Sequence, residues 1–249
     1  MIRFKPANRL LLTGLLIVSA VSAGYAYWAT VRADGPVRWV SVPELPQKLK
    51  LLDSVFWEPL DTVKLRKLLI EKPELVQGKS VLEIGTGSGL VAICCLEAGA
   101  ASVLATDVNP AAIRAARYNL RRYGRSAEVR QVPVGEGVDS GAFAVVPAGR
   151  RFDVIISNPP WEDSSPKRWS EYALYDPNFQ LLRSILEGGR SHLNPDGRIL
   201  LAFGCVEAIR VLRRLADELD MTVLILDERD PEELPDLFLP GMLIGILPN

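Results

Sequence analysis

Histidine and cysteine are scarce in this chain of 249 residues, which contains one histidine, His192, and three cysteines. A single histidine argues against a catalytic triad built on histidine and against a histidine-rich metal site. Two of the cysteines are adjacent, at Cys94 and Cys95, so the three do not form a disulfide framework or a metal-binding pattern. We therefore expect no bound metal.

An excess of charge of either sign is also lacking. The chain has 29 Lys and Arg residues against 30 Asp and Glu residues, which gives a formal net charge of −1. Such a chain has no global electrostatic attraction to nucleic acid or to anionic lipid. It also lacks internal repeats and low-complexity tracts, and its length fits one α/β domain with an N-terminal extension.

The N-terminus carries a long apolar run. No charged residue lies between Leu10 and Val31, and as a helix these residues would span about 30 Å, enough to cross a bilayer. The run predicts a hydrophobic helix within residues 1–31 that anchors the chain in a membrane. Small residues around Ala23 and Ala26 leave a cleaved signal peptide as an alternative, and a buried core helix is a further one.

Residues 32–59 predict a linker, because prolines punctuate them and no periodic pattern is sustained. The linker ends in an unusually aromatic stretch, Val55–Asp61, and an amphipathic helical pattern follows it. Residues 60–249 then form the main domain.

From Gly78 onward, apolar runs typical of strands alternate with helical patterns, as in a parallel sheet. We therefore predict an α/β fold with a three-layer, doubly wound, mostly parallel sheet of seven strands, whose ligands lie outside the carboxyl ends of the strands. The expected helices are Leu90–Ala98, Pro110–Tyr123, Asn178–Leu193 and Val206–Asp220. The expected strands are Ser80–Ile84, Ser102–Thr106, Glu128–Val132, Phe152–Ser157, Arg198–Phe203, Thr222–Leu226 and Met242–Leu247.

The stretch Val81–Leu90 (VLEIGTGSGL) turns the first of these strands sharply into a helix. Its alternating glycines indicate a cofactor cradle, because glycine adopts unusual backbone angles and lets a ligand approach the backbone closely. Asp107 ends the second strand, 18 residues past the last glycine, where a carboxylate accepts hydrogen bonds from ribose hydroxyls. Both a nicotinamide dinucleotide and S-adenosylmethionine would suit this pair of features.

Two details favour S-adenosylmethionine. The glycine spacing is G-x-G-x-G, whereas a dinucleotide loop has G-x-G-x-x-G, with its third glycine placed for close helix packing. Glu83 would put a carboxylate where a pyrophosphate should lie, but it suits the cationic end of an amino acid. A dinucleotide-binding oxidoreductase stays as the alternative.

The fourth strand ends in Asn158-Pro159-Pro160-Trp161. The amide oxygen of Asn158 and the carbonyl of Pro159 can accept both hydrogens of a planar –NH2 group and aim its lone pair at an electrophilic methyl. Trp161 offers a flat face on which an amide or a base can stack. Because the nitrogen becomes acidic only after methyl transfer, catalysis would rest on orientation and electrostatics.

These motifs resemble those of class I S-adenosylmethionine-dependent methyltransferases, with Val81–Leu90 as the first motif and Ala105–Pro110 as the second. In that family, N-P-P-[YFW] marks enzymes that methylate glutamine amides or exocyclic base nitrogens. Val55–Asp61 is similar to a segment that covers the cofactor in release-factor glutamine methyltransferases. The resemblance implies catalytic roles for Asn158, Pro159, Pro160 and Trp161, and cofactor contacts for Glu83, Gly85, Thr86, Gly87, Asp107 and Asn158.

We thus predict a Rossmann-like methyltransferase domain over residues 60–249 that methylates a planar amino or amide nitrogen. Protein glutamine is the preferred acceptor; an adenine or guanine amino group of a nucleic acid and a small molecule are alternatives. Because the cofactor is cytosolic, the sequence predicts a single-pass membrane protein with its catalytic domain facing the cytosol, with export after signal cleavage as the alternative. The loop Asp163–Tyr175 is either a substrate-facing lid or a plain surface loop.

Overall fold

The computed structural model describes residues 36–135, 141–234 and 241–249. The chain divides into two compact units, residues 1–37 and 38–249, and the fold given below is that of the second unit. The hydrophobic helix expected within residues 1–31 lies outside the described residues.

The expected membrane localisation needs correction. In the part of the chain that the structure describes, no helix is long and apolar enough to cross a membrane. The longest described helices have 13 residues, which is about 20 Å of helix against the roughly 30 Å of a bilayer core. The prediction of a single-pass membrane protein with its catalytic domain facing the cytosol is wrong on this finding.

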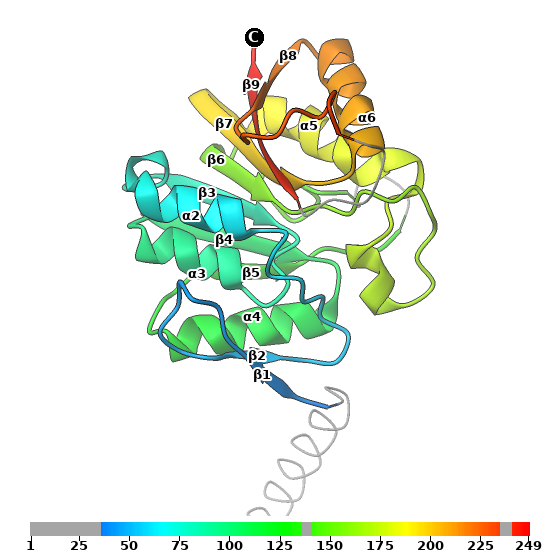
Figure 1. Ribbon diagram of the computed structural model, residues 1–249. Coiled ribbons are helices and arrows are strands. Elements are labelled where there is room, and N and C mark those ends of the chain that lie inside the picture. Colours follow the sequence, from blue (N-terminus) through cyan, green and yellow to red (C-terminus); the bar gives the residue numbers. More distant parts are fainter. Residues whose placement is uncertain (1–35, 136–140, 235–240) are drawn as a thin grey trace, which may run out of the picture. The chain divides into compact units, whose positions relative to one another are not determined.

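A seven-stranded sheet forms the centre of this second unit, in the order β5-β4-β3-β6-β7-β9-β8 (Figure 1). The five strands from β5 to β7 run parallel, and β9 is antiparallel to both of its neighbours. The predicted mostly parallel seven-stranded sheet is therefore confirmed. The strands are β3 (Ser80–Ile84), β4 (Ser102–Asp107), β5 (Glu128–Gln131), β6 (Phe152–Ser157), β7 (Leu193–Phe203), β8 (Met221–Ile225) and β9 (Met242–Pro248).

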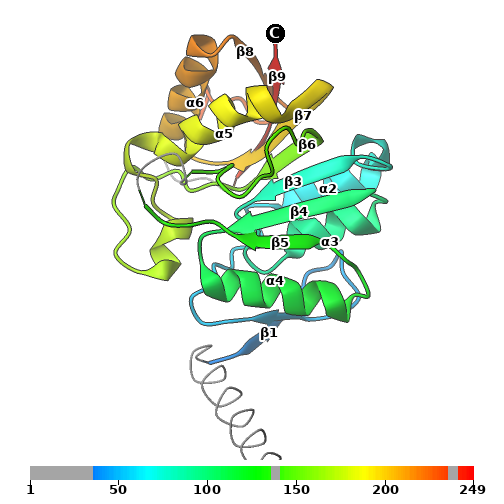
Figure 2. The ribbon, with the colours of Figure 1, turned by 180° about the vertical axis from the view of Figure 1, so that it is seen from behind.

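Helices cover both faces of the sheet because both faces are apolar. Along β3, Val81 packs with the helices of one face and Leu82 with those of the other, and both side chains are fully buried. Figures 1 and 2 show α2, α3 and α4 on one side and α5 and α6 on the other. The helices are α2 (Val63–Glu71), α3 (Leu90–Glu97), α4 (Pro110–Arg122), α5 (Gln180–His192) and α6 (Val206–Glu218), with short 3-10 helices η1 (Pro73–Leu75), η2 (Trp169–Ala173) and η3 (Pro177–Phe179).

The segment predicted as a linker contains a two-stranded antiparallel sheet, β1 (Arg38–Val40) and β2 (Leu49–Leu51). Leu51 is fully buried and packs with alanines of α4. Asn119, buried on α4, accepts a hydrogen bond from the Lys50 N–H (2.7 Å) and donates to the Lys50 carbonyl (2.9 Å). Side-chain contacts therefore join this segment to the α/β body ahead of Val55–Asp61.

The sheet also places the ligand site. Strand β3 lies between β4 and β6, so the chain moves outward from β3 in one direction and returns to its other side at β6. In doubly wound sheets, ligands bind at this switch in strand order, outside the carboxyl ends of the strands. The glycine loop follows β3 and Asn158 follows β6, so both stand at this point.

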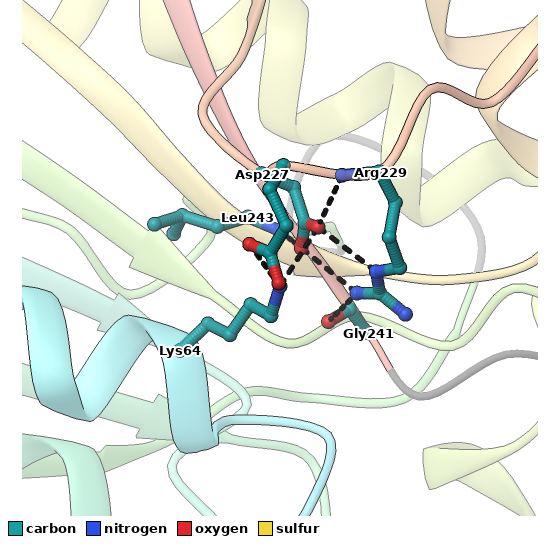
Figure 3. A network of polar contacts seen from close by, with 6 residues as sticks. Lys64, Asp227, Arg229, Gly241 and Leu243 are labelled. Atoms are coloured by element: carbon teal, nitrogen blue, oxygen red, sulfur yellow. Dashed lines mark hydrogen bonds and ion pairs between the residues drawn. The ribbon is translucent and has the colours of Figure 1, made fainter.

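A buried carboxylate joins α2 to the far edge of the sheet (Figure 3). Asp227 accepts hydrogen bonds from Lys64 Nζ on α2 (2.9 Å) and from Arg229 Nε and Nη2 (2.8 Å each). The Leu243 N–H also donates to it (3.4 Å), and Arg229 donates to the Gly241 carbonyl (3.3 Å). Burial alone would raise the pKa of Asp227, but the bonds from Arg229 and Lys64 outweigh it, so the pKa lies well below its usual range.

We expect Asp227→Ala to lower the free energy of unfolding by about 2 kcal/mol, because two partly buried cations lose their buried partner. Glu228→Ala is the matched control, since Glu228 also pairs with Lys64 but its side chain is 79% exposed. This control should leave the free energy of unfolding nearly unchanged, because solvent screens an exposed ion pair. Urea unfolding at pH 7 measures both variants, and equal losses would show that burial does not set the strength of the network.

Candidate active site

The carboxyl ends of the central strands open onto one cavity of about 740 Å³. Its wall is completed by residues 54–59 on one side and by parts of residues 165–184 on another. Eight of the nine predicted site residues line it: Glu83, Gly85, Thr86, Gly87, Asp107, Asn158, Pro159 and Pro160. Trp161 is not among the described residues that line this cavity.

The glycine loop borders open space. Gly85 has a φ of +77° and Gly87 a φ of +54°, in the left-handed region that favours glycine. A Cβ atom at either position would meet no other atom within 4 Å. The two glycines therefore face room for a ligand, which fits the predicted cradle.

The N–H groups of this loop are turned inward. Those of Gly85 and Thr86 both donate to the carbonyl of Thr106 (2.9 Å each), and that of Gly87 donates to Asp107 Oδ2 (2.9 Å). A phosphate cradle depends on backbone N–H groups that point at the ligand. Since these three are already bonded within the protein, the loop is poorly suited to a pyrophosphate.

The side chain of Glu83, on β3, contacts the first turn of α3 from the protein interior. Its carboxyl group is almost fully buried and accepts a hydrogen bond from Thr86 Oγ1 (2.6 Å), and the Ala92 N–H in the first turn of α3 also bonds to it. Burial raises the pKa of Glu83 to about 8, the Thr86 bond opposes the rise, and the nearby Asp107 adds to it. A carboxyl group here takes the place of an anion and offers a partner to an ammonium group.

Asp107 braces two turns at once. Its Oδ2 bonds the Gly87 N–H, and its Oδ1 accepts from the Asn109 N–H (2.8 Å). Asn109 in turn caps α4, accepting from the Ala111 N–H (2.9 Å) and donating to the Ser54 carbonyl (2.9 Å). Burial raises the pKa of Asp107 to about 6 against the lowering effect of backbone N–H bonds. This carboxylate therefore holds the glycine loop and the start of α4 in register.

Asn158 leaves a polar atom without a partner in the cavity wall. The strand before it is fixed by a hydrogen bond from Ser157 Oγ to the Ile84 carbonyl (2.8 Å), which joins the ends of β6 and β3. Asn158 Oδ1 is buried and has no hydrogen-bond partner among the described residues. Leaving such an atom unpaired costs about 1–3 kcal/mol, so the site is prepared for a donor from outside the protein.

The side chain of Trp161 lies elsewhere than the sequence suggested. It is 8% exposed and packs edge-on against Phe203, with ring centroids 6.5 Å apart and an interplanar angle of 76°. Both rings belong to the core under α5 and α6. The stacking role predicted for Trp161 therefore has no support from its position.

The aromatic stretch Val55–Asp61 forms one wall of the cavity, through Phe56 and Trp57 among others. Arg66, buried on α2, holds the stretch by donating to the Pro59 carbonyl (2.7 Å) and pairing with Glu44 (3.3 Å). Sequence reasoning missed Arg66, because an arginine in an amphipathic helix is typical of a solvated face.

The raised pKa of Glu83 predicts how stability depends on pH. Its folded pKa of about 8 lies above the ordinary 4.5, so the folded protein binds more protons than the unfolded chain, and stability falls as the pH rises from 5 to 8. Glu83→Gln removes this loss. Between pH 5 and pH 8, the melting temperature of the wild type should therefore fall relative to that of the variant. The expected relative fall is about 3 °C or more, which corresponds to roughly 1 kcal/mol of stability. Parallel profiles without ligand would contradict the shifted pKa.

Comparison with known proteins finds similarity to methyltransferases, in agreement with the geometry of the cavity. Residues 61–159 match the family model described as ribosomal protein L11 methyltransferase (PrmA). A release factor glutamine methyltransferase of Cereibacter sphaeroides is 35% identical over 140 residues, which are 51% of this chain and 48% of the relative. The chain matches about half the length of the first curated relatives.

Two solved structures show the same fold. The ribosomal protein L11 methylase of Lactobacillus delbrueckii subsp. bulgaricus aligns with a TM-score of 0.54 at 23% identity, covering 77% of this chain and 79% of that one. The 16S rRNA N2 G1207 methyltransferase of T. thermophilus, in complex with AdoMet and guanosine, aligns with a TM-score of 0.59 at 16% identity. That alignment covers 86% of this chain and 50% of the other.

Fold, motifs and comparisons define the class of protein that this chain resembles: it is similar to class I S-adenosylmethionine-dependent methyltransferases. Within this class, the chain is similar to release factor glutamine methyltransferases. The predicted cofactor, S-adenosylmethionine, agrees with these comparisons, and it fits the open glycine cradle and the buried Glu83. The roles of the individual site residues stay predictions.

Proposed function

We propose that this protein transfers a methyl group from S-adenosylmethionine to the side-chain amide nitrogen of a protein glutamine. The unpartnered Oδ1 of Asn158 in the cavity wall carries this proposal. It is a hydrogen-bond acceptor at the end of β6, in the same cavity as the cradle. The names of the glutamine methyltransferase relatives support the choice of acceptor.

Residues on the β3 and β4 side would hold the cofactor. Gly85, Thr86 and Gly87 would border its methionine end, where the Glu83 carboxyl group would pair with the α-ammonium group. Asp107, whose two oxygens already bond backbone N–H groups, has lone pairs left for ribose hydroxyls. When bound, S-adenosylmethionine supplies an electrophilic methyl group on a sulfonium sulfur.

Residues at the end of β6 would orient the acceptor. A primary amide is a weak nucleophile because its nitrogen lone pair is delocalised into the carbonyl. Asn158 Oδ1 and the Pro159 carbonyl accept one N–H each, which holds the –NH2 group in one plane and points its lone pair at the methyl. The nitrogen would gain the methyl as the carbon–sulfur bond breaks, and the electron pair of that bond would stay on sulfur in S-adenosylhomocysteine. After transfer the nitrogen is acidic enough to lose one proton to water. The chain therefore contributes orientation and electrostatics.

Transfer of a labelled methyl group tests the proposal. The full chain is incubated with methyl-labelled S-adenosylmethionine in two separate reactions. One contains the protein fraction of a cell extract, and the other contains the RNA fraction. After complete digestion, the label should be found in the protein fraction as N5-methylglutamine. Label in methylated adenosine or guanosine of the RNA fraction would overturn the choice of acceptor.

A further inference from the structure

The connection between β6 and α5 presents an aromatic pair to the cavity. Trp169 and Tyr172, both on η2, have ring centroids 5.6 Å apart with an interplanar angle of 31°. Both side chains line the same cavity as Asn158. Trp169 is 43% exposed, whereas Trp161 is 8% exposed. A partly exposed aromatic surface therefore forms part of the cavity wall.

The loop that carries this pair is closed at its base. Glu162 and Tyr175 form a β-bridge. The Glu162 N–H donates to the Leu174 carbonyl (3.3 Å), and the Asp176 N–H donates to the Glu162 carbonyl (2.8 Å). Residues 163–174 thus leave the body of the protein and return to the same point, as in a compact Ω-type loop.

The base of the loop is fastened to α5. The buried carboxyl group of Asp176 accepts from the N–H groups of Leu181 (2.8 Å) and Leu182 (3.0 Å) at the start of that helix. Asp163 Oδ1 accepts from the Asn178 N–H (2.7 Å). The loop is therefore anchored to a helix that packs on the sheet.

A second set of bonds orders the loop around Trp169. The Glu171 carboxylate accepts from the Lys167 N–H (2.7 Å) and from Arg168 Nε and Nη2 (3.0 and 2.7 Å). Residues 167–171 are thereby drawn into a turn with Trp169 in its middle. Intraloop bonds thus order the backbone that carries the exposed indole.

We propose that Trp169 and Tyr172 form the surface on which the acceptor stacks, so that its planar amide lies against them while Asn158 and Pro159 bind the –NH2 group. This proposal rests on the proposed function and moves the stacking role from Trp161, which is buried against Phe203. The methylene arm of a glutamine is apolar, and its amide group is planar. Aromatic faces suit such a group and exclude water around it.

Steady-state kinetics of the full chain tests this surface. Trp169→Ala should raise the KM for the glutamine-containing acceptor by about tenfold, with a smaller rise for Tyr172→Ala. Trp169→Phe keeps an aromatic face and should restore most of the loss. The affinity for S-adenosylmethionine, measured by calorimetry, should stay within about twofold of the wild type, because neither ring is assigned to the cradle.

Trp39→Ala is the matched control, because Trp39 is equally exposed, at 45%, but is not among the described residues that line the cavity. It should leave the KM unchanged. If the wild type methylates glutamine and Trp169→Ala has an unchanged KM, the stacking surface is overturned and the proposed function is kept. A wild type that methylates a nucleoside would overturn the proposed acceptor. A raised nucleoside KM in Trp169→Ala would then still support the stacking surface.

Discussion

Asn158→Ala is expected to slow methyl transfer by about 10³-fold at saturating cofactor, the size of loss seen when one preorganised hydrogen-bonding group is removed from an active site. The reason is that Oδ1 of Asn158 is the acceptor that the cavity wall leaves unpaired. Affinity for S-adenosylmethionine should fall by less than about tenfold, the worth of a single hydrogen bond. Single-turnover kinetics and calorimetry separate the two effects.

Asn158→Asp provides the matched comparison. The aspartate keeps an oxygen of the same reach and should therefore retain more activity than the alanine variant. Asn194→Ala controls for the loss of an asparagine outside the cavity, since Asn194 bonds Asp153 (2.7 Å) at the opposite end of the sheet's strands. Full activity in Asn158→Ala would refute the role assigned to this amide.

Asp107→Ala should weaken S-adenosylmethionine binding by about 100-fold, or about 2.7 kcal/mol. Two losses combine, because the ribose hydroxyls lose an acceptor and the Gly87 and Asn109 N–H groups lose the carboxylate that holds their turns. The chain offers a control on the neighbouring strand, since Gln131 pairs with Asp107 across β4 and β5. Gln131→Ala should change the dissociation constant by less than about threefold.

Isothermal calorimetry of the two variants decides this prediction. A dissociation constant that is unchanged in Asp107→Ala would mean that the carboxylate is only a structural brace. Comparable losses in both variants would mean that the edge of the sheet, and not the carboxylate, governs binding.

The sheet was predictable because its signal is local. Strand β3 contains two adjacent apolar residues, Val81 and Leu82, which are buried on opposite faces, and the glycines after the strand mark the turn. The hairpin of β1 and β2 was not predictable in this way. Its strands have three residues each, and the bonds of Asn119 to Lys50 join positions that are 69 residues apart.

In the candidate site, too, features set by local sequence were predictable, whereas features set by contacts between distant residues were not. Glycine spacing and Asp107 indicated the cradle because both are set by short-range turns. The sequence does not show that the Gly85 and Thr86 N–H groups donate to the Thr106 carbonyl, since these hydrogen bonds cross between strands. Nor does it tell on which side of the turn the ring of Trp161 lies, because packing against Phe203 decides it.

The central claim is that this cavity binds S-adenosylmethionine and not a dinucleotide. Calorimetric titration of the full chain with S-adenosylmethionine and, separately, with NAD tests it most directly. The inward-turned loop N–H groups and the carboxyl of Glu83 at the start of α3 predict that S-adenosylmethionine binds at one site per chain and that NAD gives no binding heat. Binding of NAD, or no binding of S-adenosylmethionine, would contradict the account.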